Sequence, residues 1–350
     1  MRVCVVGGGL AGSLLAWRLA QLPGTQVELM TGPGPAADAT AASGGAVRAY
    51  ETLPAQRGLA IASLTELLAS PVLREWAQYH ETGFAYLRDP ADGLAAELAE
   101  IEQAVPGSAE LMAAAEAFGG RDGPGWTGDE TGVVVRERRA GRTSPAALRD
   151  AVLADLAARP RATVRPAWLD PAWLDPATSR ALRHQDAVVL ATGAWTAGLL
   201  RASGLPADGY RTRSIQYTIY PAGPARPPAF ADERTGLYGL PVADGGLLLG
   251  VPTTAWEVAP GPNPVDPAGQ ERARRLAAGF FPRLTLGPAR RQAGAADCYY
   301  HPPVLALREI QGQLPRLFTF TGGSGGSAKS ALAASQRAAW QLTEVPEHAR

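Results

Sequence analysis

The sequence predicts an α/β fold, in which a parallel sheet flanked by helices is joined to a second, mainly antiparallel α+β region. Two largely apolar runs, residues 2–6 and 187–191, are typical of strands buried on both faces of a parallel sheet. A glycine-rich turn follows the first run and precedes residues with helical leucine spacing. Between residues 210 and 300, strand-like segments alternate with proline-rich turns, which indicates a second, separate sheet.

The first 30 residues predict a strand–helix–strand unit. Residues 2–6 form the first strand, the leucines of residues 10–22 recur at helical spacing, and residues 26–30 form the second strand. Pro23 and Gly24 end the helix between them. This βαβ unit is the building block of a parallel sheet.

The later elements are predicted from composition and periodicity. Residues 57–120 are rich in Ala, Leu and Glu, which favours a mainly helical region. A tandem duplication, residues 166–170 and 171–175, is too short for a repeat architecture and predicts a surface insertion. We expect its Trp168 and Trp173 to pack within the loop, and the alternative is that they form a platform for the substrate. We expect further strands at 187–191, 214–220, 246–251 and 316–320, and helices near 141–158, 268–279 and 331–342.

Length, composition and charge limit the class of protein. The chain has 350 residues, of which 46% are hydrophobic, so we expect two folded domains rather than disorder. The 33 basic residues balance the 33 acidic ones, which gives no electrostatic footprint for nucleic acid or an anionic membrane. Two cysteines, Cys4 and Cys298, are too few for a disulfide framework. Glycines interrupt the apolar N-terminal stretch, so we predict no signal peptide and expect a soluble, cytoplasmic protein.

The turn after the first strand carries a nucleotide-binding signature. Gly7, Gly9 and Gly12 fit the pattern G-x-G-x-x-G directly after a buried strand and at the start of a helix. The first glycine permits the tight turn, the second lets the main chain approach a pyrophosphate, and the third allows close helix–strand packing. Thr31 stands where an acidic residue would bind the ribose, and its hydroxyl is a weaker ligand. A dinucleotide site is therefore predicted, with weakened ribose recognition.

Four further segments in the same order complete a resemblance to a known family. They are residues 39–48 (ATAASGGAVR), 141–148, 188–195 (VVLATGAW) and 321–329 (TGGSGGSAK). Together with the glycine turn, they resemble the D-amino-acid oxidase-like family of FAD-dependent oxidoreductases, especially its sarcosine oxidase and glycine oxidase branch. The resemblance covers residues 3 to about 342, nearly the whole chain.

The resemblance implies a fold, a domain organisation and a cofactor. It implies an FAD-binding Rossmann-like domain of the glutathione-reductase type and a second, mainly antiparallel α+β substrate domain. The FAD domain would be discontinuous, with residues 1–80, 142–212 and 302–350, and the substrate domain would comprise 81–141 and 213–301. The implied cofactor ligands are Gly7, Gly9, Ala11, Gly12, Thr31, Ser43, Arg48, Gly193, Trp195, Cys298, Gly322, Gly325, Gly326 and Lys329.

Three residues are expected to be catalytic: Lys329, Tyr238 and Tyr300. Lys329 is the only lysine, whereas the other 32 basic residues are arginines, so its place in the last glycine-rich loop is improbable by chance. The resemblance implies that Lys329 faces the flavin or a substrate carboxylate, and that Tyr238, in the segment LYGLP, matches an active-site tyrosine. The helix N-terminus after this loop would stabilise the negative charge of a reduced flavin by roughly 0.3–1 kcal/mol.

Cys298 leaves two interpretations open. Residues 297–301 (DCYYH), which include Tyr300, resemble the Cys-x-Tyr segment of monomeric sarcosine oxidases, where the thiol is joined to the flavin 8α-methyl group. That bond requires a thiolate at the flavin rim, near a charge that stabilises it. The alternative is a buried structural cysteine, which is also the expectation for Cys4.

Three positions depart from the sarcosine oxidase pattern. Leu248 stands where a lysine helps oxygen to react with the reduced flavin, and Pro252 stands where a histidine follows. Glu51 replaces a second arginine that helps to clamp the substrate carboxylate. The flavin-binding segments are thus retained while the substrate pocket differs, so sarcosine is not the expected substrate.

Three functions remain open at this point. The first is oxidation of a C–N bond of an amine or imino acid, by hydride transfer to flavin N5, with oxygen or another electron acceptor. The second is tailoring of a specialised metabolite by desaturation, hydroxylation or rearrangement, and the third is nucleotide binding without redox chemistry. The expected partner is a small-molecule substrate, with neither nucleic acid nor membrane. The histidines, His80, His184, His301 and His348, show no metal-ligand spacing, so no metal is expected.

Overall fold

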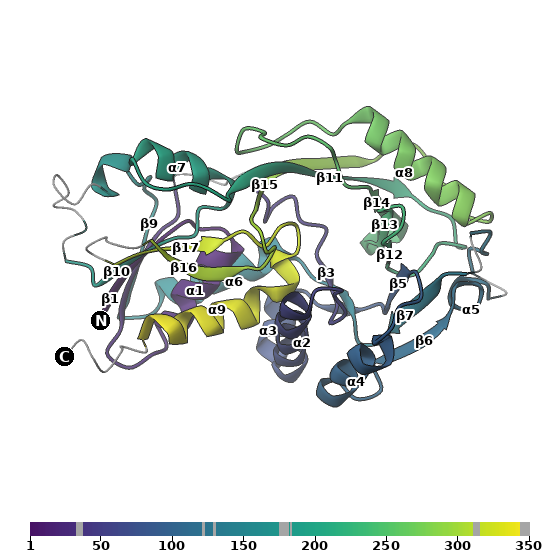
Figure 1. The fold of residues 1–350 in the computed structure, drawn as a ribbon, viewed down its shortest axis with the longest axis horizontal. Helices are drawn as coiled ribbons and strands as arrows, with labels where there is room; N and C mark the ends of the chain where they lie inside the picture. The colour runs from purple at the N-terminus through teal and green to yellow at the C-terminus, as the bar shows by residue number, and fades with distance from the viewer. Residues whose placement is uncertain are drawn as a thin grey trace.

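The structure, a computed structural model, describes residues 1–32, 38–120, 123–128, 131–174, 182, 184–310 and 316–343. His348, the side chain of Trp173 and the last residue of the duplication lie outside the described residues. Within the described part, a six-stranded sheet, an eight-stranded sheet and a small three-stranded sheet form the framework. Figure 1 shows the six-stranded sheet and its helices at one end of the molecule and most of the eight-stranded sheet at the other.

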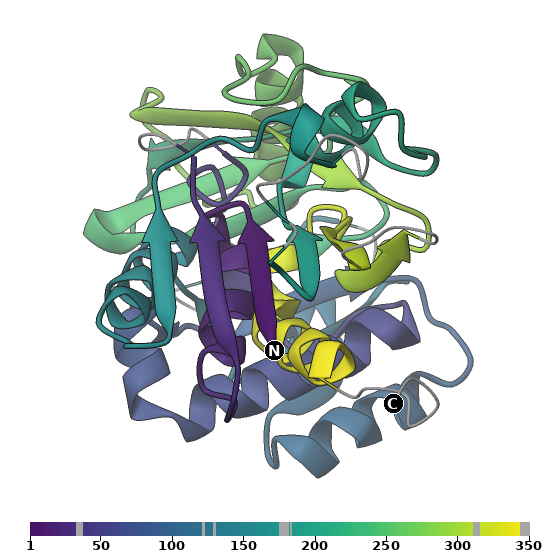
Figure 2. The ribbon, with the colours of Figure 1, turned by 90° about the vertical axis from the view of Figure 1, so that its left-hand side faces the viewer.

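The six-stranded sheet carries the predicted parallel core. Its strands run in the order β16 (Ala306–Ile310), β17 (Arg316–Thr321), β10 (Ala187–Leu190), β1 (Arg2–Val6), β2 (Gln26–Met30) and β9 (Ala162–Arg165). All neighbours are parallel except β16 and β17. Figure 2 shows β1, β2 and β9 side by side. The four strands that the sequence predicts here are confirmed, and β9 and β16 are additional.

The side chains of β1 and β2 divide between two hydrophobic clusters because successive residues of a strand face opposite sides. Val3, Val5 and Leu29 pack with the helices α1 (Leu10–Leu19), α6 (Pro145–Ala157) and α9 (Ser327–Thr343). Cys4 and Val6 pack on the other face, together with Leu200 of α7 (Thr196–Ala202) and Cys298. The parallel sheet is therefore buried on both faces, as the apolar runs indicate.

The eight-stranded sheet forms the second region, and all of its neighbouring strands are antiparallel except β12 and β5. Its order is β15 (Arg291–Tyr299), β11 (Arg211–Pro221), β14 (Gly246–Gly250), β13 (Tyr238–Pro241), β12 (Phe230–Asp232), β5 (Phe84–Arg88), β7 (Val133–Glu137) and β6 (Ala109–Ala113). The helix α8 (Pro267–Phe280) packs on it through buried Ala273 and Ala277. Figure 1 shows α8 along the outer side of this region.

The remaining elements are helices, short strands and 3-10 turns that lie between the strands of the two large sheets. They are the helices α2 (Pro54–Ala69), α3 (Pro71–Trp76), α4 (Leu94–Ala104) and α5 (Ala114–Phe118), the short strands β3 (Ala46–Val47), β4 (His80–Glu81) and β8 (Gly141–Arg142), and the 3-10 turns η1 (Pro171–Leu174), η2 (Gly193–Trp195) and η3 (Ala243–Gly245). The three short strands form the third sheet. No helix of the described chain is long and apolar enough to cross a membrane.

The α/β fold with a second, antiparallel region is confirmed, but several predicted boundaries are wrong. Residues 57–120 are not mainly helical throughout, because β5 and β6 interrupt the helices with strands of the second sheet. The predicted helix over 141–158 starts later, since Ser144 caps it by accepting the amide of Ala147. The last helix starts earlier than predicted, at Ser327, so Lys329 lies in its first turn. The domain boundaries stay a prediction.

Candidate cofactor and substrate site

The glycine turn between β1 and α1 is shaped by close packing. Gly7 has a positive φ of 120°, and a Cβ there would lie 2.3 Å from the carbonyl oxygen of Ala191. A Cβ on Gly12 would lie 2.1 Å from the carbonyl oxygen of Gly7. A Cβ on Gly9 would instead meet nothing closer than Thr40 Oγ1 at 3.4 Å. Gly7 and Gly12 are thus required by the fold, whereas Gly9 leaves main chain open to a ligand at the start of α1.

A cavity of about 1020 Å³ extends from this turn to the second sheet. It brings together segments that are far apart in the sequence: the glycine turn, the loop that precedes β3, the turn after β10, and the loop between β17 and α9. The predicted site residues that line it are Gly7, Gly9, Ala11, Thr31, Ser43, Arg48, Gly193, Trp195, Tyr238, Gly325, Gly326 and Lys329. Gly12, Gly322, Cys298 and Tyr300 do not line it.

The loop from Gly322 to Gly326 is fastened to the end of β15. The amide of Gly325 donates to Asp297 Oδ2 at 2.8 Å, and the amide of Ser324 donates to the carbonyl oxygen of Cys298 at 3.2 Å. Asp297 is buried at the cavity wall, and this burial raises the pKa of its carboxyl above the usual value. Asp297 therefore holds this loop in place, a role that the motif comparison misses. A lone acidic residue in an apolar strand could have indicated it.

Lys329 and Arg48 both line the cavity and share one carboxylate. Lys329 Nζ and Arg48 Nη2 each lie 2.9 Å from Glu51 Oε1, and Glu51 itself does not line the cavity. Burial alone would raise the pKa of Glu51, but the charges of Arg48 and Lys329 outweigh it and lower the pKa. Burial also lowers the pKa of Lys329, with Glu51 opposing that shift. Glu51 therefore stays ionised and compensates charge on the two cations.

The guanidinium of Arg48 is held from several sides. Its Nε donates to the carbonyl oxygen of Tyr50 at 3.0 Å, and its Cζ lies 4.8 Å and 4.9 Å from the ring centres of Phe84 and Tyr86. These cation–π contacts fix the plane of the guanidinium. A buried carboxylate, Glu137, accepts the amides of Ala49 and Tyr50 at 2.7 Å and 2.8 Å, and its burial raises its pKa. Arg48 therefore has a fixed position in the cavity wall.

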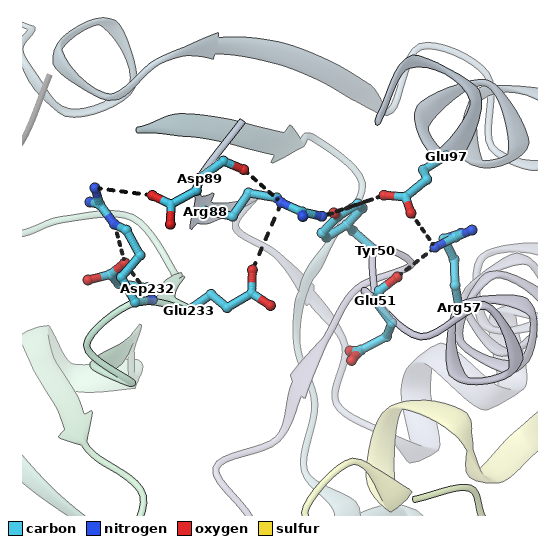
Figure 3. A network of polar contacts seen from close by, with 9 residues as sticks. Tyr50, Glu51, Arg57, Arg88, Asp89, Glu97, Asp232 and Glu233 are labelled. Carbon is cyan, nitrogen blue, oxygen red and sulfur yellow. Dashed lines mark hydrogen bonds and ion pairs between the residues drawn. The ribbon is translucent and has the colours of Figure 1, made fainter. Parts of the chain in front are cut away.

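A polar network behind the cavity supports the chain at Tyr50 and Glu51 (Figure 3). Arg57 of α2 donates to the carbonyl oxygen of Glu51 at 3.0 Å and pairs with Glu97 of α4 at 3.1 Å. The hydroxyl of Tyr50 donates to the second oxygen of Glu97 at 3.1 Å and accepts a hydrogen bond from Arg88 of β5. The network thus joins elements of both regions to the segment that carries Glu51 (Figure 3).

The structure does not support a thioether at Cys298. Residues 297 and 299 of β15 line the cavity, so the side chain between them points to the opposite face, where Cys298 is 3% exposed among apolar residues. Burial raises the pKa of the Cys298 thiol to about 11, which disfavours the thiolate that the bond requires. We therefore favour the structural interpretation of Cys298.

We predict that acid precipitation of the holoprotein will release all of its flavin into the supernatant, because neither Cys4 nor Cys298 lines the cavity. The supernatant absorbance measures the released flavin, and Cys298→Ala serves as the matched variant. A wild-type pellet that stays yellow, beside a Cys298→Ala pellet that turns white, would contradict this prediction.

Tyr300 also faces away from the cavity, and this placement does not support the catalytic role expected for it. Its ring packs 4.8 Å from that of Tyr210 and 4.0 Å from the guanidinium of Arg308. The neighbouring Tyr299 lines the cavity instead. Strand alternation explains the placement of both Cys298 and Tyr300, because a shift of one residue in phase exchanges the two faces of a strand.

The other singled-out positions lie in the cavity wall. Tyr238 is partly buried beside Gly250 and donates its hydroxyl proton to the carbonyl oxygen of Gln216. Leu248 is 2% exposed and faces the loop that precedes β3, since a Cβ on Gly44 would lie 3.3 Å from it. Pro252 follows it along the same wall. The roles of these residues stay predictions.

The described residues fit FAD. The free main chain at Gly9 and the start of α1 suit a pyrophosphate, while Thr31 lies at the carboxyl end of β2, where the ribose binds in such folds. The Gly325–Lys329 end of the cavity, with the start of α9, suits the negatively charged edge of a reduced flavin. The cavity is continuous between the two ends, as a long dinucleotide requires.

Comparisons with known proteins agree with this geometry. Residues 2–340 match the DAO family, described as FAD dependent oxidoreductase. The fold is similar to L-proline dehydrogenase from P. horikoshii, with a TM-score of 0.76, 16% identity, and coverage of 98% of this chain and 93% of that chain. It is also similar to glycine oxidase from Geobacillus kaustophilus, with a TM-score of 0.73, 19% identity, and coverage of 99% and 96%. A search of curated proteins finds no match.

The fold and the cavity define a flavin-dependent oxidoreductase, with a nucleotide-binding sheet and a second sheet that faces it across one cavity. The chain belongs to the DAO family of FAD-dependent oxidoreductases.

Proposed function

We propose that this oxidoreductase oxidises the C–N bond of an amine that carries no free carboxylate. FAD held between the glycine turn and the Gly325–Lys329 loop would supply the hydride acceptor, so that a secondary amine would lose a hydride from the carbon next to nitrogen and a proton from nitrogen and become an imine. Oxygen or another electron acceptor would take up the two electrons. The binding of FAD is non-covalent in this proposal, because Cys298 faces away from the cavity.

The contact of Glu51 with both cavity cations carries the substrate proposal. A substrate carboxylate would seek Lys329 and Arg48, but Glu51 Oε1 lies 2.9 Å from each of them. A second anion would therefore enter against the repulsion of a buried carboxylate. The same cavity is also lined by Tyr217, Leu240 and Leu248, which favours an apolar body on the substrate.

Anaerobic mixing of the holoprotein with two matched panels tests this proposal. One panel contains secondary amines without a carboxylate, and the other contains the corresponding N-alkyl amino acids. We expect members of the first panel to bleach the flavin absorbance and the second panel to bleach it poorly. Bleaching by the amino acids alone would overturn the substrate proposal, although C–N oxidation would stand.

Tailoring of a specialised metabolite is the second candidate function. The observation that favours it is Leu248, because an apolar residue in the wall provides no cation for the reaction of reduced flavin with oxygen. NikD, an amino acid oxidase essential for nikkomycin biosynthesis, shares the fold at 18% identity, with a TM-score of 0.67 and coverage of 99% of this chain and 95% of NikD. A yellow protein that neither panel bleaches would favour this candidate. Membership of an oxidoreductase family removes the support for nucleotide binding without redox chemistry.

We predict that Leu248→Lys will accelerate reoxidation of the chemically reduced protein by oxygen at least tenfold. A cation about 4 Å from a developing negative charge contributes roughly 4 kcal/mol at an effective dielectric constant of about 20, and solvation reduces this value. Stopped-flow mixing of reduced protein with oxygenated buffer measures the rate, and Leu248→Met controls for the change in shape. Equal, fast reoxidation of all three proteins would show that another group activates oxygen.

A further inference from the structure

Trp168 combines exposure with a place at the cofactor cavity. Its side chain is 63% exposed, the highest value among the exposed large hydrophobic residues of the described chain, and it lines the cavity. The expectation that Trp168 packs within its loop is therefore wrong. An aromatic ring left largely in water beside a ligand cavity has apolar area that a planar ligand would cover.

The loop that carries Trp168 is fastened to the end of β2. The amide of Thr31 donates to the carbonyl oxygen of Arg165 at 3.0 Å, and the amide of Gly32 donates to that of Ala167 at 3.2 Å. The Trp168 ring lies over Gly32, because a Cβ there would be 3.5 Å from two of its ring carbons. Main-chain hydrogen bonds and this contact thus fix the ring at the nucleotide end of the cavity.

The same end lacks the usual polar anchor. Thr31 stands where an acidic residue would bind the ribose. Its hydroxyl lies within hydrogen-bond distance of two main-chain carbonyl oxygens, that of Gly32 at 3.1 Å and that of Arg165 at 3.4 Å. In a sheet whose order passes from β1 through β2 to β9, a dinucleotide bound at Gly9 extends its adenosine past β2 towards β9. Trp168 follows β9 directly, so its ring lies along this path.

We propose that Trp168 stacks on the adenine of FAD and supplies binding energy that the ribose contact at Thr31 does not. Stacking of a base on an aromatic side chain needs no hydrogen-bond partner, because every base presents a π-face. The inference rests on FAD binding at this cavity and is independent of the substrate proposed above.

Titration of the apoprotein with FAD and with FMN, followed by quenching of flavin fluorescence, tests this role. FMN carries the flavin and one phosphate but no adenine. We expect Trp168→Ala to raise the Kd for FAD at least tenfold, about 1.4 kcal/mol, and to leave the Kd for FMN within twofold. Trp168→Phe should restore most of the FAD affinity. Trp340→Ala is the matched control, because Trp340 is 55% exposed and does not line the cavity.

Competition by ADP, which has the adenine without the flavin, gives a second measurement. The Kd of ADP, measured by its displacement of FAD, should be lower for the wild-type protein than for Trp168→Ala. An unchanged Kd for FAD in Trp168→Ala, or an equal loss of FAD and FMN affinity, would overturn the stacking role. Because no readout depends on turnover, a failure of the proposed amine oxidation leaves these outcomes unaffected.

Discussion

The Gly9→Ala variant will fold normally and bind FAD at least thirtyfold more weakly than the wild type. A Cβ on Gly9 meets the protein only at ordinary contact distances, 3.4 Å from Thr40 Oγ1 and 3.7 Å from Asp38 Oδ2. The added methyl group therefore costs the apoprotein little, but it occupies space next to the main chain that the pyrophosphate needs. A thirtyfold loss corresponds to about 2 kcal/mol, within the range for hydrogen bonds to a charged group.

Gly12→Ala provides the matched comparison. Its Cβ would lie 2.1 Å from the carbonyl oxygen of Gly7, so the backbone must shift, and we expect a loss of about 1–3 kcal/mol in the free energy of unfolding of the apoprotein. Thermal unfolding of both apoproteins and fluorescence titration with FAD separate the two effects. Wild-type FAD affinity in Gly9→Ala would contradict the placement of the pyrophosphate at this turn.

The Glu51→Gln variant will bind benzoate at least ten times more tightly than the wild type, with unchanged affinity for benzamide. Glutamine keeps the shape of Glu51 and one acceptor oxygen, but it removes the charge that Lys329 and Arg48 share. A unit charge at about 4 Å contributes roughly 4 kcal/mol at an effective dielectric constant of about 20, and solvent in the cavity reduces this value. Titration of the holoprotein, followed by the change in flavin absorbance, measures both affinities.

The pH dependence of benzoate binding gives an additional criterion. Burial lowers the pKa of Lys329, and loss of its proton at high pH removes one of the two cations. Benzoate affinity of Glu51→Gln should therefore fall with rising pH, starting below the range in which an ordinary lysine titrates. Glu97→Gln is the control, because Glu97 belongs to the supporting network and pairs with Arg57 and Arg88 (Figure 3). Equal benzoate affinity of wild type and Glu51→Gln would contradict the charge-sharing argument.

Residues whose role follows from the local chain were predictable from the sequence. Gly7 and Gly12 reflect close packing at one turn, which the structure shows directly, and Gly9 between them leaves main chain open to a ligand. Likewise, the apolar runs of β1 and β10 were sufficient to predict a parallel sheet, because both faces of that sheet are covered.

Residues whose role depends on the phase of a strand or on distant partners were not predictable in the same way. Cys298 and Tyr300 match a motif by spacing, but the face of β15 that meets the cavity is set by its pairing with β11. The replacement at Glu51 was visible in the sequence, whereas its position behind Arg48 and Lys329 arises from contacts between α9 and the segment before α2. The position of Trp168 depends on main-chain hydrogen bonds that join its loop to the end of β2, and no pattern of side chains in the sequence reveals such bonds.

The order of strands in the six-stranded sheet bears on when the protein can acquire its cofactor. The phosphate turn follows β1, near the N-terminus, while β17 and α9 provide the flavin end of the cavity more than 300 residues later. A growing chain therefore presents the pyrophosphate site long before Lys329 has been synthesised. The complete cavity exists only after β17 pairs with β10 and α9 packs against α1. Binding of FAD across the whole cavity therefore requires the last helix, and it would stabilise that helix, since a ligand that binds only the folded chain stabilises it.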